Sequence, residues 1–586
     1  MPDSARINID TYREGLVPLI IGVSGHRDLI EDEIPEIRSL VRAFFVQLTA
    51  RFPDRKLHII SPLAEGADRV VAEEALKLGL SFAVPLPMPR EIYVDDFESE
   101  ASRQGFEDLC QQAETIYELP IASGVTPEEL REYGKARNLQ YARLGVFLCA
   151  HSHILLALWD GKPSDESGGT AQVVEFHHND VMVGFDASGS ISQQLLADDE
   201  SDLVYHVVVS RDREGGTPLA GLDALSCSWF TTDEAAPRTA KLPKTYVRIF
   251  DRTSDFNRDA KQHASIIQEK CYPLLDERSW IEATEEIERI DRIFCAADWL
   301  ASHYQSRMLG ALRAFHGLAF VMGMMFVLYS DLEARRFFLV GLIVCLVGAL
   351  VIHRVAARGN WHSKYLEYRT LAEGLRVQFY WAVGGVTSEI ATKYSHDNFL
   401  QKQDIELGWI RNVMRVAGIG CDVSASIDPK GLAFVLDEWI GEDETGGQLK
   451  YYRSKATSYL VHSRRNRRLG QIVGITVPLI ILWMLLAQSD SVRDPLFVIL
   501  GALLLFVSVR QSYAFKVAEA EVIKQYEFMY RIFRNARRRL NNVSSDSDRR
   551  RILRALGESA LDEHAEWILL HRDRPLDQGS LWRMEI

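Results

Sequence analysis

The stretch Ile20-Ile-Gly-Val-Ser-Gly-His-Arg-Asp28 decides the fold of the N-terminal region. An apolar run ends in small residues, and apolar positions at helical spacing follow over residues 34–48. A strand that leads into a helix in this way leaves backbone N–H groups free to meet a phosphate. The candidate ligand residues in this stretch are Gly22, Ser24, Gly25, His26 and Arg27. A tight turn without a ligand is the alternative for this segment alone.

Outward from this stretch, short apolar runs alternate with amphipathic segments from about 17 to 210, which is the pattern of βαβ units. The runs are rich in Ile, Val and Leu, as strands covered on both faces should be. The candidate strands are 18–23, 56–60, 82–86, 154–159 and 204–209, and the candidate helices between them are 34–48 and 67–78. The expected fold is a doubly wound, Rossmann-like α/β domain with a mostly parallel sheet.

Two further loops follow predicted strands. They are Ile60-Ser-Pro-Leu-Ala-Glu-Gly-Ala-Asp-Arg69 and Trp159-Asp-Gly-Lys-Pro-Ser-Asp-Glu-Ser-Gly-Gly-Thr-Ala171. Their candidate ligand residues are Ser61, Glu65, Gly66, Asp68, Arg69, Asp160, Gly168, Gly169 and Thr170. Asp68 and Thr170 are alternatively helix caps, with Arg69 as a partner for Asp68. Because ligands of open α/β sheets bind outside the carboxyl ends of the strands, the three loops are expected to converge on one site.

In this order, Gly-x-Ser-Gly-His-Arg-Asp, Ala-Glu-Gly-Ala-Asp-Arg and Gly-Gly-Thr resemble the SLOG superfamily. That superfamily is the Rossmann-like fold shared by DNA-processing proteins and the "lonely guy" nucleoside monophosphate phosphoribohydrolases. The resemblance covers residues 17–210 and implies a nucleotide-binding domain. It implies a nucleotide-derived ligand, either a cyclic nucleotide or an ADP-ribose derivative, with no other cofactor and no metal.

The sequence departs from the hydrolase branch of the superfamily at one position. That branch reads Gly-Thr-x-x-Glu, and its carboxylate takes part in N-glycosidic cleavage. Here Thr170-Ala-Gln is followed by Val173. Glu175 lies two residues further, on another side of the predicted helix, and acid–base catalysis requires placement within hydrogen-bond reach. The departure favours a sensor over an enzyme, and no catalytic residue is expected.

Length and composition limit the class of protein. A chain of 586 residues is expected to form about three or four units. The 67 basic and 81 acidic residues give a net charge of -14, which argues against a polymeric nucleic-acid partner. Seven cysteines without a CxxC pair indicate reduced thiols rather than disulfides or a zinc site. The start of the chain lacks the apolar run of a signal peptide, so the N-terminal half is expected in the cytosol.

The C-terminal half is predicted to be helical and to enter a membrane. Residues 211–278 carry only weak strand and helix signals and stay unplaced, and amphipathic helical spacing begins at about residue 280. Four stretches then lack formal charge almost entirely: 314–330, 337–353, 469–489 and 495–509. Only the third clearly reaches the roughly 18 to 20 apolar residues of a comfortable bilayer span. The expectation is two transmembrane hairpins, and the alternative is a buried hairpin in a soluble protein.

Basic residues flank both predicted hairpins, and they set the expected orientation. Arg313 and Arg354 border the first hairpin, and Arg468 and Arg510 border the second. By the positive-inside bias, the N-terminal domain and the C-terminus lie in the cytosol of a multi-pass protein in a bacterial inner membrane. Residues 331–336 and 490–494 are then short periplasmic turns.

The two hairpin regions are predicted to be an approximate internal repeat. Tyr365-Leu-Glu-Tyr-Arg-Thr-Leu-Ala-Glu-Gly-Leu-Arg376 follows the first hairpin, and Tyr526-Glu-Phe-Met-Tyr-Arg-Ile-Phe-Arg534 follows the second. Tyr368-Arg-Thr-Leu-Ala-Glu-Gly-Leu-Arg376 within the first of these, together with Glu563-His-Ala-Glu-Trp-Ile-Leu-Leu-His-Arg-Asp-Arg-Pro-Leu576, resembles SLATT modules. These are two-helix membrane effectors that occur beside SLOG sensors in bacterial anti-phage operons.

The resemblances together imply an anti-phage membrane effector whose cytosolic domain senses a nucleotide-derived second messenger and whose hairpins, in a homo-oligomer, disrupt the membrane. The alternatives are a membrane-tethered phosphoribohydrolase that uses Glu65 or Glu175 as its acid, and a non-catalytic scaffold. The expected organisation is an N-terminal segment (1–16), the nucleotide-binding domain (17–210), an extension or linker (211–278), and two helical regions with one hairpin each (279–425 and 426–586).

Overall fold

A computed structural model of the chain describes residues 12, 15–97, 99–164, 168–179, 182, 202–275, 281, 283–331, 335–386, 399–400, 405–421, 429–444, 446–486 and 489–572. Parts of several predicted features lie outside these residues. Among them are the N-terminal segment except for residues 12, 15 and 16, positions 165–167 of the third loop, residues 332–334 of the first predicted periplasmic turn, residues 487 and 488 of the third apolar stretch, and the tail motif beyond residue 572. The chain forms two compact units, Met1–Ala296 with Gly374–Gly431, and Ala297–Glu373 with Leu432–Ile586. We call them the α/β unit and the helical unit.

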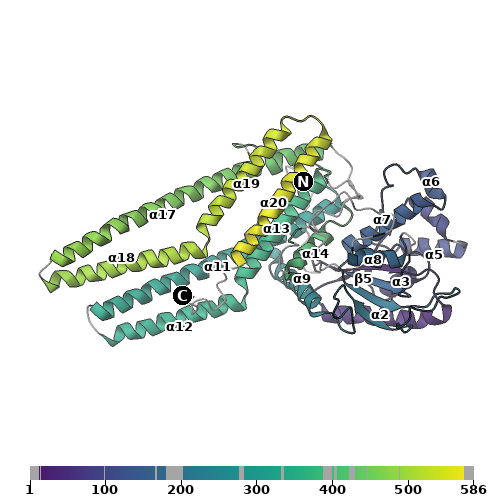
Figure 1. Ribbon diagram of the computed structural model, residues 1–586, viewed down its shortest axis with the longest axis horizontal. Helices are drawn as coiled ribbons and strands as arrows, with labels where there is room; N and C mark the ends of the chain where they lie inside the picture. The colour runs from purple at the N-terminus through teal and green to yellow at the C-terminus, as the bar shows by residue number, and fades with distance from the viewer. Residues whose placement is uncertain are drawn as a thin grey trace. The chain divides into compact units, whose positions relative to one another are not determined.

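An eight-stranded sheet forms the centre of the α/β unit (Figure 1), with the order β4-β3-β2-β1-β5-β6-β7-β8. The strands are β1 (Leu19–Gly25), β2 (Leu57–Ile60), β3 (Ser81–Leu86), β4 (Thr115–Glu118), β5 (Ile154–Trp159), β6 (Val204–Val208), β7 (Cys227–Phe230) and β8 (Arg238–Thr239). The pairings from β4 to β6 are parallel, and β7 and β8 add antiparallel strands. The predicted doubly wound α/β fold is confirmed.

The five strands predicted from the sequence are all present, whereas β4 was missed because its four residues are only partly buried and lack an apolar run. β7 and β8 come from the segment that stayed unplaced, residues 211–278, and so does the helix α9 (Lys244–Gln262). In β1 the first six residues are buried, and in β5 all six are buried. This burial explains why these two strands gave the clearest signal in the sequence.

Helices cover both faces of the sheet. Those before and between the strands are η1 (Glu31–Glu33), α2 (Ile34–Arg51), α3 (Ala67–Lys77), α4 (Arg90–Tyr93), η2 (Val94–Asp96), α5 (Glu100–Cys110), α6 (Pro127–Arg131), α7 (Lys135–His151) and α8 (Thr170–Asn179). A Cβ atom at Gly22 would lie 2.9 Å from the Ser152 Oγ atom at the end of α7, and one at Gly25 would lie 2.3 Å from the Ala67 Cβ atom of α3. Since positions 22 and 25 point to opposite faces of a strand, α7 and α3 pack on opposite sides of β1.

Later segments of the chain complete the α/β unit at the amino end of the sheet. They are α9, α10 (Ala264–Lys270), η4 (Ile405–Leu407) and α14 (Gly408–Ala417). The side chain of Asn257 in α9 accepts a hydrogen bond from the Val17 amide at 3.0 Å and donates to the Val17 carbonyl at 3.0 Å. The Nε2 atom of His153 lies 3.0 Å from the Asn412 carbonyl oxygen of α14, which is buried along its whole length.

The helical unit contains two long hairpins. Its helices include the parts of α11 (Glu285–Asp331), α13 (Trp361–Val383) and α16 (Pro429–Phe434) that fall within it, together with α12 (Arg336–Arg358), η5 (Val435–Ile440), α17 (Gly447–Leu486), α18 (Asp490–Lys516), α19 (Glu519–Leu540) and α20 (Asp546–Arg572). α11 and α12 form the first hairpin, and α17 and α18 form the second (Figure 1). The hairpins touch each other, since the His316 Nε2 atom lies 3.3 Å from the Ser512 Oγ atom.

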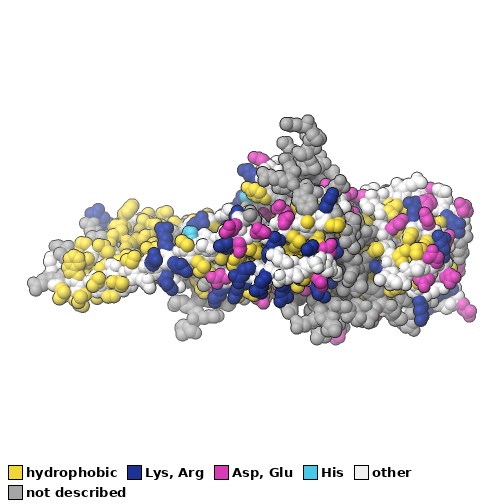
Figure 2. All heavy atoms as spheres, turned by 90° about the horizontal axis from the view of Figure 1, so that it is seen from above, with side chains coloured by type: hydrophobic (Ala, Val, Ile, Leu, Met, Phe, Trp, Pro, Cys, Tyr) yellow, Lys and Arg dark blue, Asp and Glu magenta, His cyan; other side chains and the backbone are white. Residues whose placement is uncertain are grey.

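Four helices of the chain are long and apolar enough to cross a membrane. At most 11% of the residues in any of their apolar windows are buried, so these helices do not form the core of a soluble protein. Figure 2 shows hydrophobic side chains covering the hairpins, with Lys and Arg gathered where the apolar surface ends. The short apolar stretches lie within longer helices, of which α11 has 47 residues and α17 has 40. The prediction of a loop at 490–494 was wrong, because these residues belong to α18.

Replacing Ile343 by Arg tests the lipid-facing surface. Ile343 lies near the middle of the apolar stretch of α12, and 62% of the residue is exposed. The Ile343→Arg variant should cost about 2.5 to 3.5 kcal/mol of insertion free energy, because a guanidinium near the bilayer centre loses its hydration. The measurement is the fraction of protein that alkaline carbonate extracts from membranes. Val355→Arg is the matched control, since Val355 is 50% exposed on the same helix but lies beyond the apolar stretch. Equal extraction of the two variants would contradict a membrane-embedded α12.

Candidate functional site

A cavity of about 430 Å³ lies at the carboxyl ends of β1 and β5. The chain runs outward from β1 to β4 on one side, and β5 and β6 extend the sheet on the other, so these two neighbours mark the point where the strand order reverses. Splayed connections at such a point leave a crevice in which open α/β sheets bind their ligands. Its volume falls in the usual range for small-molecule sites, roughly 300 to 1,000 Å³.

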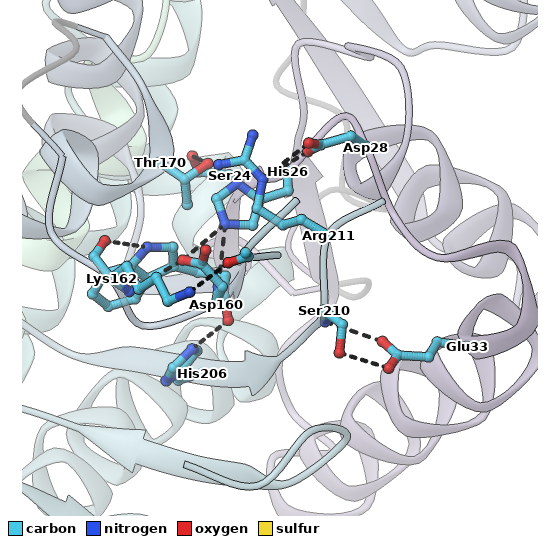
Figure 3. A network of polar contacts seen from close by, with 12 residues as sticks. Ser24, His26, Asp28, Glu33, Asp160, Lys162, Thr170, His206, Ser210 and Arg211 are labelled. Atoms are coloured by element: carbon cyan, nitrogen blue, oxygen red, sulfur yellow. Dashed lines mark hydrogen bonds and ion pairs between the residues drawn. The ribbon is translucent and has the colours of Figure 1, made fainter. Parts of the chain in front are cut away.

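His26 and Asp160 join the two strand ends at the floor of this cavity (Figure 3). The His26 amide donates to the Leu158 carbonyl at 3.0 Å, and the Asp160 amide donates to the His26 Nε2 atom at 3.1 Å. The Oδ1 atom of Asp160 lies 3.2 Å from the same nitrogen. Burial lowers the pKa of His26 below its usual value, and Arg211 adds to this effect while Asp160 opposes it. His26 is therefore neutral near pH 7 and acts as a hydrogen-bonding group.

Basic side chains surround the cavity. Arg211, in the loop after β6, donates through Nε to the two Asp28 carboxylate oxygens at 2.8 and 3.1 Å. The Lys162 Nζ atom donates to the Gly215 carbonyl at 2.7 Å and has no carboxylate partner among the described residues. Arg213 lines the cavity, is exposed, and forms no ion pair with any described residue. The positive charge of the rim thus exceeds what the nearby carboxylates neutralise, which favours an anionic ligand.

The N-terminus of α8 opens into the same cavity, because Gly168, Gly169, Thr170 and Ala171 line it. The Ser24 Oγ atom donates to the Thr170 Oγ1 atom at 3.3 Å and ties this helix to the end of β1. Gly168 has a φ of +82°, and a Cβ atom there would lie 2.5 Å from the Tyr141 Cβ atom. The first amides of a helix have no partner within the helix and carry its positive dipole end. This end of the cavity is suited to a phosphate.

Asp68 is the unusual acid of the site. It lines the cavity, is 3% exposed, and its Oδ1 atom has no hydrogen-bond partner among the described residues. Burial raises the pKa of its carboxyl from 3.8 to about 7, although Arg27 opposes part of this rise. Asp68 does not cap α3, whose cap is Gly66 without a side-chain bond. An orphaned buried oxygen at a cavity wall is a natural contact for a ligand hydroxyl.

Nine of the fourteen predicted ligand residues line the cavity: Ser24, Gly25, His26, Arg27, Asp68, Asp160, Gly168, Gly169 and Thr170. The other five, Gly22, Ser61, Glu65, Gly66 and Arg69, do not line it and instead hold the surrounding loops together.

Gly22 lies within β1, where a Cβ atom would meet the Ser152 side chain, and the roles of the other four residues follow from their contacts. Gly66 has a φ of +78°, and a Cβ atom there would lie 2.3 Å from the Arg27 carbonyl oxygen. Glu65 accepts a hydrogen bond from the Ser102 hydroxyl, and Arg69 donates to the Ser102 carbonyl at 2.9 Å. The Ser61 Oγ atom donates to the Asp68 carbonyl at 3.3 Å.

Sequence reasoning missed several residues of the cavity: Asp28, Tyr93, Tyr141, Lys162, Arg211 and Arg213. Ser210-Arg-Asp-Arg-Glu-Gly-Gly216 follows the predicted strand 204–209. Because this loop lies at the carboxyl end of a parallel strand, as the other three loops do, its residues were equally good candidates for the site. Tyr93 and Tyr141 are on helices with no local signal.

His177 and His153, each of which has a second histidine within two residues in the sequence, have structural contacts. The His177 Nε2 atom lies 3.3 Å from the Leu203 carbonyl oxygen, and the His153 Nδ1 atom accepts from the Ile20 amide at 2.9 Å. Within the described part of the chain, no group of three or more His, Cys, Asp or Glu side chains could hold a metal ion.

Comparison with known proteins gives no relative: no protein-family model matches the chain, and no curated protein has significant sequence similarity to it. What is established is therefore the architecture, a parallel-dominated α/β sheet followed by a helical region with four candidate membrane-spanning helices.

A buried carboxylate, Asp96, supports one wall of the cavity. It accepts hydrogen bonds from Arg137 and Tyr141, and Tyr133 donates to it at 3.3 Å. The Nη2 atom of Arg27 lies 3.7 Å from it and donates to the Tyr141 hydroxyl at 3.3 Å. Asp96 and Arg137 are each 2% exposed at the side chain, so each depends on the other for charge compensation.

The Asp96→Ala variant should destabilise the α/β unit by about 3 to 5 kcal/mol, because it leaves the Arg137 guanidinium buried without a carboxylate. The measurement is urea-induced unfolding of the full chain in detergent. Asp95→Ala is the control, since Asp95 is the exposed neighbour of Asp96. If both variants unfold at the same urea concentration, the ion pair does not carry this stability.

The raised pKa of Asp68 predicts a pH dependence of stability. The carboxyl ionises near pH 3.8 in the unfolded chain and near pH 7 in the folded protein, so folding favours the neutral form. The contribution of Asp68 to stability is therefore fully present below pH 3.8 and falls as pH rises to about 7, by up to about 1.4 kcal/mol per pH unit. The Asp68→Asn variant keeps a neutral side chain at every pH.

The Tm of the Asp68→Asn variant minus the Tm of the unmodified protein should increase from about pH 5 to about pH 7 and then level off. The measurement is thermal unfolding across this range, with Asp95→Asn as the control. A Tm difference that stays constant with pH would rule out the proposed protonation state.

Proposed function

We propose that the chain is a ligand-gated membrane effector whose α/β unit binds a nucleotide-derived, phosphate-bearing molecule. The observation that carries the proposal is the cavity at the β1–β5 reversal point, where basic side chains and the start of α8 face the same space. Phosphate is the anion that both features recognise. The SLOG-like order of the three loops supports a nucleotide as the source of that phosphate.

The contacts of the ligand follow from the chemistry of the cavity. Its phosphate lies between the first amides of α8 and the side chains of Arg211 and Arg213. The orphaned oxygen of Asp68 and the hydroxyl of Ser24 are suited to the hydroxyl groups of a ribose. The net positive rim disfavours an uncharged nucleoside.

The response is expected in the hairpins, because the same chain carries four helices that can span a bilayer. A ligand changes their arrangement only if it binds two states of the protein with different free energies. The positive-inside bias supports a cytosolic α/β unit and C-terminus, and the SLOG-like and SLATT-like motifs support a bacterial cell. Anti-phage defence by disruption of the inner membrane, by a homo-oligomer, rests on the SLOG-like and SLATT-like motifs.

A nucleotide N-glycosidase is the second candidate, and Asp68 is the observation that favours it. In that reaction water attacks the anomeric carbon, the N-glycosidic bond breaks, and the base leaves with a proton. A carboxyl with a pKa of about 7 at the cavity wall is able to donate that proton. Neither acid suggested by the sequence is suited to it, since Glu65 accepts from Ser102 and Glu175 accepts from Asn179 at 2.8 Å. Chromatography of nucleotides incubated with the protein distinguishes enzyme from sensor by the release of free base.

Ligand binding is tested by thermal unfolding of the purified chain with cyclic dinucleotides, nucleoside monophosphates and ADP-ribose. At least one should raise the Tm, because a ligand stabilises the folded state by RT ln(1 + [L]/Kd). Arg213→Glu should weaken that ligand about tenfold or more, since a charge-assisted contact becomes a repulsion. Lys241→Glu, at an exposed position outside the cavity, should leave the affinity unchanged.

The same ligand should release dye from liposomes that contain the protein, while chromatography recovers it unchanged. Absence of a Tm shift with every nucleotide would refute the ligand assignment. Release of free base with turnover would instead support the N-glycosidase hypothesis over the sensor hypothesis.

A further inference from the structure

We infer that the helical unit carries a second ligand site, separate from the cavity of the α/β unit, for a phosphate ester. A cavity of about 430 Å³ lies between helices of both hairpin regions, with walls from α11, α13, α17, α19 and α20 and from the end of α18. All of its lining residues belong to the helical unit.

The charge of this cavity has one sign. Its ionisable lining residues are Arg369, Lys455, Lys516, His362, His564 and His571 together with tyrosines, and none of the described residues that line it is Asp or Glu. Arg369 is compensated from outside the lining by Asp298 at 3.0 Å and by Glu373. Lys455 forms no ion pair with a described residue, and its Nζ atom lies 5.7 Å from the centre of the Tyr451 ring. A space of this size lined by cations without anions is suited to an anionic guest.

A buried residue with an unsatisfied polar atom also lines this cavity. His564 is 9% exposed, and its Nδ1 atom has no hydrogen-bond partner among the described residues. Its Nε2 atom lies 3.6 Å from a Glu373 carboxylate oxygen. Buried polar atoms in proteins are nearly always satisfied, so an unpartnered nitrogen that lines a cavity marks a position for a ligand oxygen.

Aromatic side chains complete the site. The rings of Tyr459 and Tyr526 stack with centroids 5.4 Å apart, and the ring of Tyr365 meets that of Trp567 edge to face at 5.9 Å. The Gln305 side chain donates to the Tyr365 hydroxyl at 3.1 Å. Ring faces and hydroxyls of this kind recognise a sugar, a polyol or a base beside a phosphate.

The position of the cavity along the helices admits two sources of the phosphate. Leu312 lies two residues before the apolar stretch of α11, about 3 Å along the helix axis, whereas Lys455 lies 14 residues before that of α17, about 20 Å along it. The cavity thus extends from headgroup depth into water. The phosphate belongs either to an acidic phospholipid that enters from the membrane side or to a soluble phosphate ester.

The test is Tm measurement of the full chain in nanodiscs. One arm compares phosphatidylcholine discs with discs that also contain phosphatidylglycerol, and the other adds glycerol 3-phosphate to phosphatidylcholine discs. Two variants are designed to disable the site. Lys455→Glu reverses the charge of a lining side chain, and Ser302→Trp fills part of the cavity with a large side chain. Their matched controls on the same helices are Arg453→Glu and Ser306→Trp, at exposed positions that do not line the cavity.

A Tm rise with phosphatidylglycerol that both site variants lose and both controls keep assigns the site to a lipid headgroup. The same pattern with glycerol 3-phosphate alone assigns it to a soluble ester. The site variants should weaken the glycerol phosphate about tenfold or more. The rise should persist in the Arg213→Glu chain, which separates this site from the one proposed in the α/β unit. No Tm rise in either arm, or equal losses in site and control variants, overturns the proposal.

Discussion

Parallel pairing of β1 with strands on both of its sides is the constraint on which the candidate site depends. β1 pairs with β2 from Leu19 to Gly22 and with β5 from Ile21 to Gly25. Parallel strands require crossover connections, and those that leave β1 and β5 diverge toward opposite ends of the sheet. The polar residues that follow the two strands are consequently left beside a space that no connection fills. His26 and Asp160 close its floor because each is the first residue beyond its strand.

The position of β1 between β2 and β5 also explains why small residues are required around the site. α3 must begin directly against the turn after β1, and the Ala67 amide donates to the His26 carbonyl at 3.0 Å. Space for this contact exists only because residues 25 and 66 are glycines, the second with a left-handed backbone. These glycines allow the close backbone packing that shapes the cavity.

Elements with a local pattern of apolar residues could be predicted from the sequence. Residues whose position depends on contacts with distant segments could not. Buried strands and the amphipathic helices α2 and α3 were predictable because their periodicity records which face is covered. The edge strand β4 and the strands β7 and β8 were not predictable, because short, half-exposed strands have no clear pattern of buried apolar residues. At the site, strand-end residues were predictable from topology alone. Tyr141 was not placed, because nothing local says that its helix brings it to the cavity. Arg211 follows the predicted strand 204–209 and was predictable from topology, although it was not named as a candidate. Arg69 was named as a ligand residue, but its contacts hold a loop in place.

Gating of the membrane-spanning hairpins by a ligand requires a certain difference in binding free energy, which can be compared with the contacts available in the two cavities. A shift of a two-state equilibrium from 1:99 to 99:1 requires differential binding of about 5.5 kcal/mol. Charge-assisted hydrogen bonds contribute about 1.5 to 3 kcal/mol each, so two to four of them must differ between the states. Arg211 lies in the loop after β6, whereas α8 begins at the end of the loop after β5. Under the proposed function, a phosphate between them contacts segments that follow different strands. In the helical unit, the second cavity draws its wall from both hairpin regions, so any change in their packing alters it. Under the proposed function, a ligand that binds there with different affinities in the two arrangements of the hairpins is coupled to their state, and the coupling is reciprocal.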